Sequence, residues 1–153
     1  MRAWEWRRKA PSRGNLVPIC SAYGCNLVAM GDFRKLEAWQ AARRLAVLVH
    51  QATTAMPWRE RAGLGDQMRR SAVSVASNIA EGAGRASDRE FARFLRIARG
   101  SLQELQTQLL IAADLTLLPA EALQPLDELA ARTGRLLFGL LRYRTHGTTS
   151  PTP

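Results

Sequence analysis

Five arginines recur along one face of a predicted helix, and their side chains suit phosphate binding. They are Arg85, Arg89, Arg93, Arg96 and Arg99. At 100° per residue the first four fall within about 80° of one another, and the fifth flanks them. Only Asp88 and Glu90 are acidic between residues 85 and 99, so the face is not charge-balanced. A row of guanidinium groups can neutralise several phosphates without reading bases, and the alternative is a solvated face with no partner.

A second group of basic residues stands before an uncharged part of the second predicted helix. Arg69 and Arg70 directly precede residues 71–80, which carry no charge. They are candidates to extend the basic face, as are Arg43 and Arg44. No aromatic residue is interleaved with the arginines on the exposed side of residues 85–99, so this face does not favour base stacking. The contact expected from the arginines is with the phosphates of RNA or DNA.

The chain lacks the residue spacings of a metal centre or an enzyme. Di-metal sites in helical bundles use Glu-x-x-His, and no glutamate here has a histidine three residues later. The only histidines are His50 and His146, so a serine nucleophile has no evident base. Gly82-Ala83-Gly84 lacks the strand and the lysine of a nucleotide-binding loop. We expect no catalytic residue, no metal and no cofactor.

The uncharged segment predicts a helix that is covered on more than one side. Its apolar face carries Met68, Ala72, Val75 and Ile79, and small or apolar residues occupy much of the remaining circumference. One bundle can cover one side of such a helix, and a second copy of the chain can cover another. We therefore expect an oligomer. The residues expected to serve packing or the oligomer interface are Ser71, Val73, Ser74, Ala76, Asn78, Glu81, Gly82 and Glu104.

Two polar residues of this helix need partners if they are buried. An arginine across a helix or subunit interface would satisfy Glu81, and Asn78 could hydrogen-bond to the backbone near a helix end. We interpret both as packing residues and not as catalytic ones.

Four amphipathic helices must position these residues. Apolar residues three or four apart predict helices over residues 32–56, 66–84, 88–114 and 120–143. The core stripe predicted for the third helix consists of Phe91, Leu95, Ala98, Leu102, Leu105, Leu109 and Ala112, and that for the fourth of Ala122, Leu126, Leu129, Thr133, Leu136, Leu140 and Tyr143. Asp32 is the expected N-cap of the first helix, Pro57 ends it, and residues 58–63 form a loop. The second helix is expected to end at Gly82 or Gly84, in a left-handed conformation.

Local signals also mark the third and fourth helices. Ser87-Asp88-Arg89-Glu90 is a capping box that opens the third. Pro119 suits the first turn of the fourth, and Pro125 either shifts the start of that helix or kinks it. Because the connections are short, neighbouring helices must be antiparallel. The fold class is all-α, an up-down-up-down four-helix bundle over residues 31–144.

Composition places the chain among basic globular domains. Its 153 residues contain 22 Lys and Arg against 13 Asp and Glu, and all but two of the basic residues are arginine. This balance favours a polyanionic partner, although a GC-rich genome would also raise the arginine content. No apolar run approaches the ~18–20 residues of a membrane span. The two cysteines, Cys20 and Cys25, are too few for a disulfide framework, and we expect a cytoplasmic protein.

The two ends of the chain differ from the helical part. Residues 1–30 are basic and then mildly apolar, but Pro18, Gly24 and Asn26 interrupt the apolar part too often for a signal peptide. We expect a disordered or non-native extension, with Met30 as a candidate initiator. The chain from Met30 carries a net charge of 17 − 12 = +5. The tail, residues 145–153, is expected to be disordered.

Several segments resemble a known family. They are Phe33-x-x-Leu36-x-x-Trp39-Gln40, Ser77-Asn78-Ile79-Ala80-Glu81-Gly82 and Gly100-Ser101-Leu102-x-Glu104-Leu105. Together they resemble the four-helix-bundle proteins encoded in intervening sequences of bacterial 23S ribosomal RNA genes, over residues 32–143. The resemblance implies a cytosolic ring, a homopentamer. That family is similar to the accessory variability proteins of diversity-generating retroelements, which bind nucleic acid and a reverse transcriptase.

Two functions follow as expectations. The first is a non-enzymatic homo-oligomer whose basic surface binds RNA or DNA through phosphates. The alternative is a protein–protein adaptor for a nucleic-acid enzyme such as a reverse transcriptase, with the arginines meeting an acidic partner.

Overall fold

The computed structural model describes residues 32–146, and all regular elements within that range are helices. The long helices are α1 (Glu37–Thr53), α3 (Leu64–Ala83), α4 (Asp88–Asp114) and α5 (Ala120–His146). The short helices are η3 (Phe33–Lys35) before α1 and α2 (Trp58–Ala62) before α3. The predicted extension over residues 1–30, with both cysteines, and the tail beyond residue 146 lie outside the described residues.

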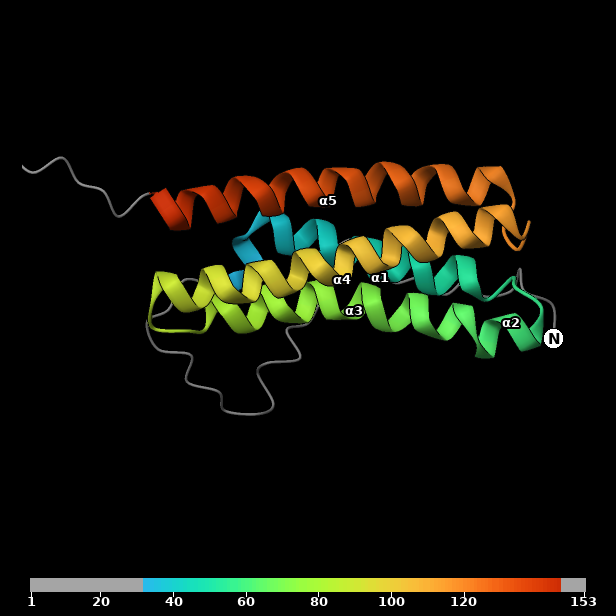
Figure 1. Ribbon diagram of the computed structural model, residues 1–153, viewed down its shortest axis with the longest axis horizontal. Helices are drawn as coiled ribbons and strands as arrows, with labels where there is room; N and C mark the ends of the chain where they lie inside the picture. The colour runs from blue at the N-terminus through green and yellow to red at the C-terminus, as the bar shows by residue number, and fades with distance from the viewer. Residues whose placement is uncertain (1–31, 147–153) are drawn as a thin grey trace, which may run out of the picture.

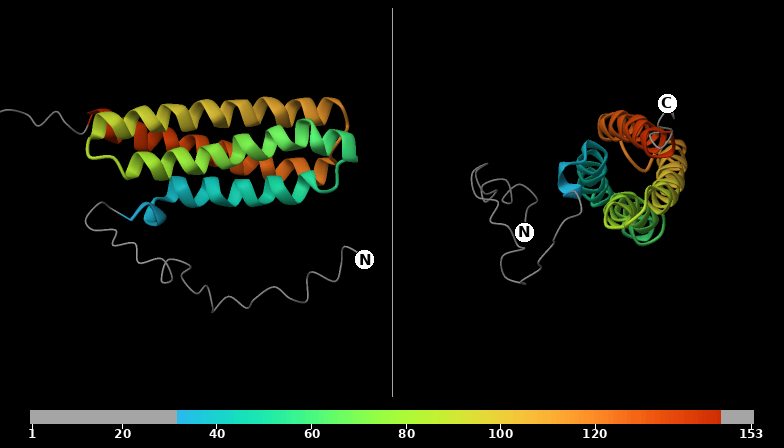
Figure 2. Two further views of the ribbon diagram at one scale, coloured as in Figure 1. Left: turned by 90° about the horizontal axis from the view of Figure 1, so that it is seen from below. Right: turned by 90° about the vertical axis from the view of Figure 1, so that its left-hand side faces the viewer.

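Successive long helices run antiparallel, as the colour gradient along the chain shows (Figure 1). The view along the bundle shows the four helices surrounding one core (Figure 2). In that arrangement α3 lies beside α1 and α4, and α5 lies beside α4 and α1. The predicted all-α four-helix bundle is confirmed.

The core receives residues from all four long helices and includes the apolar stripes that the spacing predicted for the second and third helices. On α3, Met68, Ala72, Val75 and Ile79 are fully buried. On α4 every predicted core residue is at most 4% exposed: Phe91, Leu95, Ala98, Leu102, Leu105, Leu109 and Ala112. Burying the side chains of Val, Leu, Ile, Phe and Met stabilises the fold by roughly 1.5–3 kcal/mol each.

The stripe on α5 ends differently from the prediction. Leu126, Thr133 and Leu137 are buried, but Tyr143 is 69% exposed. The buried residues of α5 include Ala130 and lie to one side of the predicted stripe, whose members Leu136 and Leu140 are only half-buried, so Tyr143 falls outside the core. Arg144, the next residue, is half-buried instead.

The first helix begins later than predicted. Asp32 caps η3 and not α1: its carboxylate accepts hydrogen bonds from the Arg34 N–H at 3.1 Å and from Arg34 Nε at 2.7 Å. The side-chain bond from Arg34 also holds the pKa of the Asp32 carboxyl below its ordinary value. Leu36 has extended backbone (φ −71°, ψ 118°), which separates η3 from α1.

The predicted loop over residues 58–63 contains a helix. α2 follows directly after Pro57, whose carbonyl accepts from the Arg61 N–H at 2.8 Å. Proline suits this place because its φ is fixed near −65° and a helix start leaves an N–H unpaired anyway.

The ends of the later helices confirm two predictions and correct two. The Ser87 hydroxyl accepts a hydrogen bond from the Glu90 N–H at 3.2 Å, so Ser87 caps α4 as predicted. α5 starts at Ala120 and continues through Pro125 to His146, so residues 145 and 146 are helical and not part of the tail. The prediction of a left-handed glycine at the end of α3 was wrong, because Gly84 has φ −83° and Gly82 lies inside the helix.

A left-handed residue occurs instead after α4, at Thr116 (φ 51°). Its N–H donates to the Ala113 carbonyl at 2.9 Å, and the Leu117 N–H donates to the Ala112 carbonyl at 2.9 Å. This pair of bonds is a Schellman motif, which usually carries glycine at the left-handed position. The backbone of Thr116 is therefore held in a conformation that is unfavourable for a residue with a Cβ atom.

Thr116→Gly is expected to raise the free energy of unfolding by about 1 kcal/mol, because the left-handed conformation costs an L-residue roughly 1–2 kcal/mol. The same substitution at Thr107, exposed in the middle of α4, should lower it by a few tenths of a kcal/mol, since glycine is the poorer helix former. Urea unfolding followed by circular dichroism measures both. A loss of stability in Thr116→Gly would contradict the assignment of strain.

Candidate nucleic-acid interface

The N-terminal half of α4 presents an unpaired row of cations to solvent. This row, the α4 arginine row, consists of Arg89, Arg93, Arg96 and Arg99, all exposed. The buried apolar stripe of α4 faces the core, so the arginines on the opposite side of the helix face solvent. None of the four forms an ion pair with any residue between 32 and 146. Their charge is thus available to an external anion.

Arg85 was predicted to share the face of this helix, but it lies in the turn that follows α3. It forms an ion pair with Glu81, and its Cζ atom lies 4.9 Å from the centroid of the Phe94 ring. The partner expected for Glu81 across an interface is therefore a residue four positions further along the same chain. Arg85 is close to the row but its charge is partly compensated.

The start of α3 lies at the opposite end of the bundle from the start of α4 (Figure 1), and Arg69 and Arg70 belong to the first two turns of α3. Arg69 is half-buried and donates to Thr53 Oγ1 at 3.2 Å, to the Arg61 carbonyl at 3.0 Å and to Asp66 Oδ1 at 3.3 Å. Arg70 pairs with Asp66 at 2.7 Å. Arg69 thus joins α1, α2 and α3, and the structure does not bring either residue to the row.

Arg144 is a basic residue near the row that the sequence analysis missed. Its Nη1 donates to Asp88 Oδ1 at 2.7 Å, and its Cζ lies 5.0 Å from the centroid of the Phe91 ring. It lines a cavity of about 270 Å³ between α4 and α5 that Arg89 and Arg96 also line. The only signal in the sequence was the antiparallel pairing, which brings the end of α5 to the start of α4.

The predicted packing residues divide into buried and exposed ones. Ser74 Oγ and Ser101 Oγ lie 2.9 Å apart and bridge α3 to α4. Asn78 Nδ2 donates to the Ser74 carbonyl at 2.8 Å, within α3 and not at a helix end. Ser71 and Gly82 are buried inside the bundle, whereas Glu104 is exposed on α4.

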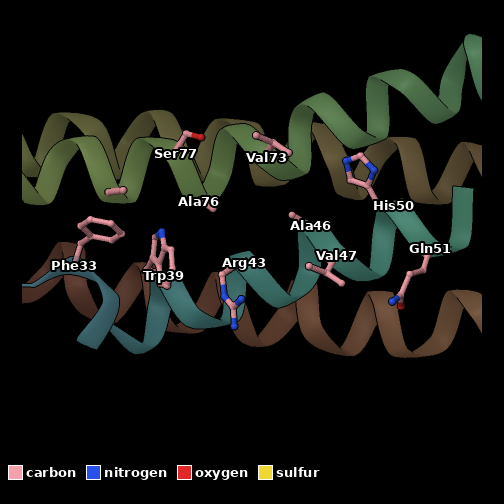
Figure 3. Close-up of a pocket in the computed structure, with 11 residues that line it drawn as sticks. Phe33, Trp39, Arg43, Ala46, Val47, His50, Gln51, Val73, Ala76 and Ser77 are labelled. Carbon is pink, nitrogen blue, oxygen red and sulfur yellow. The ribbon is translucent and has the colours of Figure 1, made fainter. Parts of the chain in front are cut away.

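A groove of about 580 Å³ lies between α1 and α3 (Figure 3). We call it the α1–α3 groove. Val47 of α1 and Val73 of α3, which line it, are 48% and 47% exposed. Ala76 and Ala80 also line it, and the Arg43 Cζ atom lies 5.7 Å from the centroid of the Trp39 ring at its edge. The groove is therefore an exposed and largely apolar surface on helices other than α4.

Between residues 32 and 146 no three His, Cys, Asp or Glu side chains are grouped closely enough to hold a metal ion. None of the helices in that range is long and apolar enough to cross a membrane.

Comparison with protein families gives a match over most of the bundle. The model of the family described as 23S rRNA-intervening sequence protein matches residues 34–139. The chain belongs to this family. A comparison with curated proteins gives no match.

The family match includes the whole α4 arginine row and both walls of the α1–α3 groove. It ends before Arg144, so the residue that joins the end of α5 to the start of α4 lies outside the matched part. The row therefore lies within the matched part, and the cation beside it lies in the last turn of α5.

Proposed function

We propose that this member of the 23S rRNA-intervening sequence protein family is a non-enzymatic, cytoplasmic homo-oligomer that binds RNA or DNA through phosphates. The observation that carries the proposal is the α4 arginine row, whose four exposed guanidinium groups have no acidic partner among residues 32–146. Arginine presents a planar fork of donors that fits two phosphate oxygens at once.

The length of the row suits a nucleic-acid strand. Arg89 and Arg99 are ten residues apart, which is about 15 Å along a helix. One strand of duplex DNA carries a phosphate about every 3.4 Å along the axis, so the row spans about four phosphates. Its side chains lie on a convex helix whose two aromatic residues, Phe91 and Phe94, are buried and do not offer a face to a base. We therefore expect little sequence preference.

The location of the row is compatible with assembly through a different surface. The α1–α3 groove lies on other helices, so a subunit covering it would leave the row exposed. Five subunits, as the resemblance to this family implies, would present five rows to one polyanion. Binding at the first row would raise the effective concentration of phosphates at the others.

The double variant Arg89→Ala with Arg93→Ala is expected to lower the affinity for a labelled duplex DNA by tenfold or more at ~50 mM salt. Two lost phosphate contacts should also reduce the slope of log affinity against log salt by about 1.8, since each contributes about 0.9 for duplex DNA. Fluorescence anisotropy between ~50 and ~200 mM salt, with duplex DNA and a structured RNA, measures both quantities.

The matched control removes two exposed arginines elsewhere, Arg132→Ala with Arg135→Ala on α5, and leaves the same net charge. Equal losses in the two double variants would show that only total charge matters and would contradict a defined site. No binding by the wild type at the lower salt would overturn the proposal. It would leave the adaptor function, in which the same arginines meet an acidic protein.

A further inference from the structure

A second cavity lies at the end of the bundle away from the α4 arginine row. It has a volume of about 480 Å³, and its lining residues are His50, Thr54, Trp58, Arg61, Ala62 and Arg69. We call it the Trp58 cavity. It combines an indole, an imidazole and two guanidinium groups, and no carboxylate lines it.

Trp58 is the unusual feature of this cavity, because its large apolar side chain is 68% exposed. Tryptophan is highly buried on average in folded proteins. Here Pro57 starts α2, and α2 carries the indole at its first residue, at the edge of the bundle. The Cζ atom of Arg59 lies 5.8 Å from the centroid of the ring. An exposed indole beside a cation is a stacking surface for a planar group.

The cations of the cavity differ in how firmly they are held. Arg69 is fixed by its hydrogen bonds to Thr53, Asp66 and the Arg61 carbonyl. The exposed guanidinium of Arg61 forms no ion pair within residues 32–146. The cavity is therefore complementary to a ligand with a flat ring and a negative charge beside it.

We propose that the Trp58 cavity binds one nucleotide of a single-stranded nucleic acid, with the base stacked on Trp58 and a phosphate on Arg61. The ligand class rests on the proposed function, but the site is separate from the α4 arginine row. α3, whose 20 residues span about 30 Å, separates the two ends of the bundle. The row binds phosphates of any strand, whereas a stacked base must be free of a duplex.

The proposal predicts a selective loss of single-strand binding in Trp58→Leu. We expect roughly tenfold weaker binding of a labelled oligothymidylate, which is within the range that base–aromatic stacking supplies. Binding of a duplex of the same length should not change, and the salt slope should stay the same because no phosphate contact is lost. Trp58→Phe keeps an aromatic face and should retain most of the affinity. Fluorescence anisotropy between ~50 and ~200 mM salt compares the affinities and salt slopes of the three proteins.

The outcomes separate this proposal from the first one. A Trp58→Leu protein that binds oligothymidylate like the wild type, or loses single strand and duplex equally, overturns the Trp58 cavity and leaves the row intact. If Trp58→Leu selectively weakens oligothymidylate binding and the Arg89→Ala with Arg93→Ala variant binds both ligands like the wild type, the Trp58 cavity is supported and the α4 arginine row is overturned. A lower mass of Trp58→Leu in solution would identify Trp58 as a subunit contact and overturn the proposal. No binding of either ligand by the wild type overturns both sites.

Discussion

Gly82→Ala is expected to lower the free energy of unfolding by about 2 kcal/mol, although alanine is the better helix former. A Cβ atom on Gly82 would lie 2.7 Å from the Phe94 Cβ and 2.7 Å from Phe91 Cδ2. The Phe94 Cβ is fixed to the backbone of α4, so only a shift of that helix away from α3 relieves the contact. Overpacking of this kind costs roughly 1–3 kcal/mol, and the gain in helix propensity returns up to about 1 kcal/mol.

Gly100→Ala is the matched control, because a Cβ atom there meets nothing within 4 Å. It should raise the free energy of unfolding by roughly 0.5–1 kcal/mol, the usual difference between the two residues inside a helix. Urea unfolding at constant protein concentration gives both values, with the midpoints moving in opposite directions. If both variants gain stability, the close approach of α3 and α4 at Gly82 is not a constraint.

The long helices could be predicted because residues close in the sequence determine each of them: capping residues at the ends and a regular spacing of apolar residues between them. α4 was predicted with its bounds because seven apolar residues alternate at spacings of four and three and Ser87 caps the first turn. α2 was missed because its five residues are too few to show a period. Its start depends on Pro57, which could equally end the preceding helix.

Glycine and threonine near the helix ends show where the prediction failed. Gly82 was predicted both as a packing residue and as a possible left-handed helix end, but it lies inside α3, where it closely approaches Phe91 and Phe94 of α4. Such a contact depends on how two helices approach each other, which the pattern of one helix does not contain. Thr116 takes the left-handed conformation that glycine would favour, and its neighbours' hydrogen bonds hold it there.

The candidate site was predictable only in part, for the same reason. The 3.6-residue period predicts which arginines of α4 face outward, and all four of the row do. It does not predict which arginine finds a partner elsewhere. The side chain of Arg69 reaches Thr53, sixteen residues away in the sequence, and Arg144 reaches Asp88, fifty-six residues away. The exposure of Trp58 likewise follows from a short helix that the sequence did not reveal.

Val73→Glu and Ala76→Glu are each expected to dissociate the proposed oligomer while the helices remain folded. Both residues line the α1–α3 groove, where an apolar surface of a second copy would cover them. A glutamate there must lose its water on assembly, which costs several kcal/mol per subunit contact even if Arg43 at the edge of the groove pairs with it. In the single bundle Val73 is 47% exposed, so a charge is tolerated and glutamate is a better helix former than valine. Light scattering should give the 17.0 kDa mass of one chain.

Ala131→Glu is the control, since it places the same charge on an exposed position of α5. It should keep the mass of the wild type, and circular dichroism should show the same helicity in all three variants. If both groove variants keep the wild-type mass, the groove is not the subunit contact.

If only Ala131→Glu dissociates the oligomer, the interface lies on α5. That result would also change the first proposal, because α5 lies beside the α4 arginine row and a subunit docked there would cover part of it.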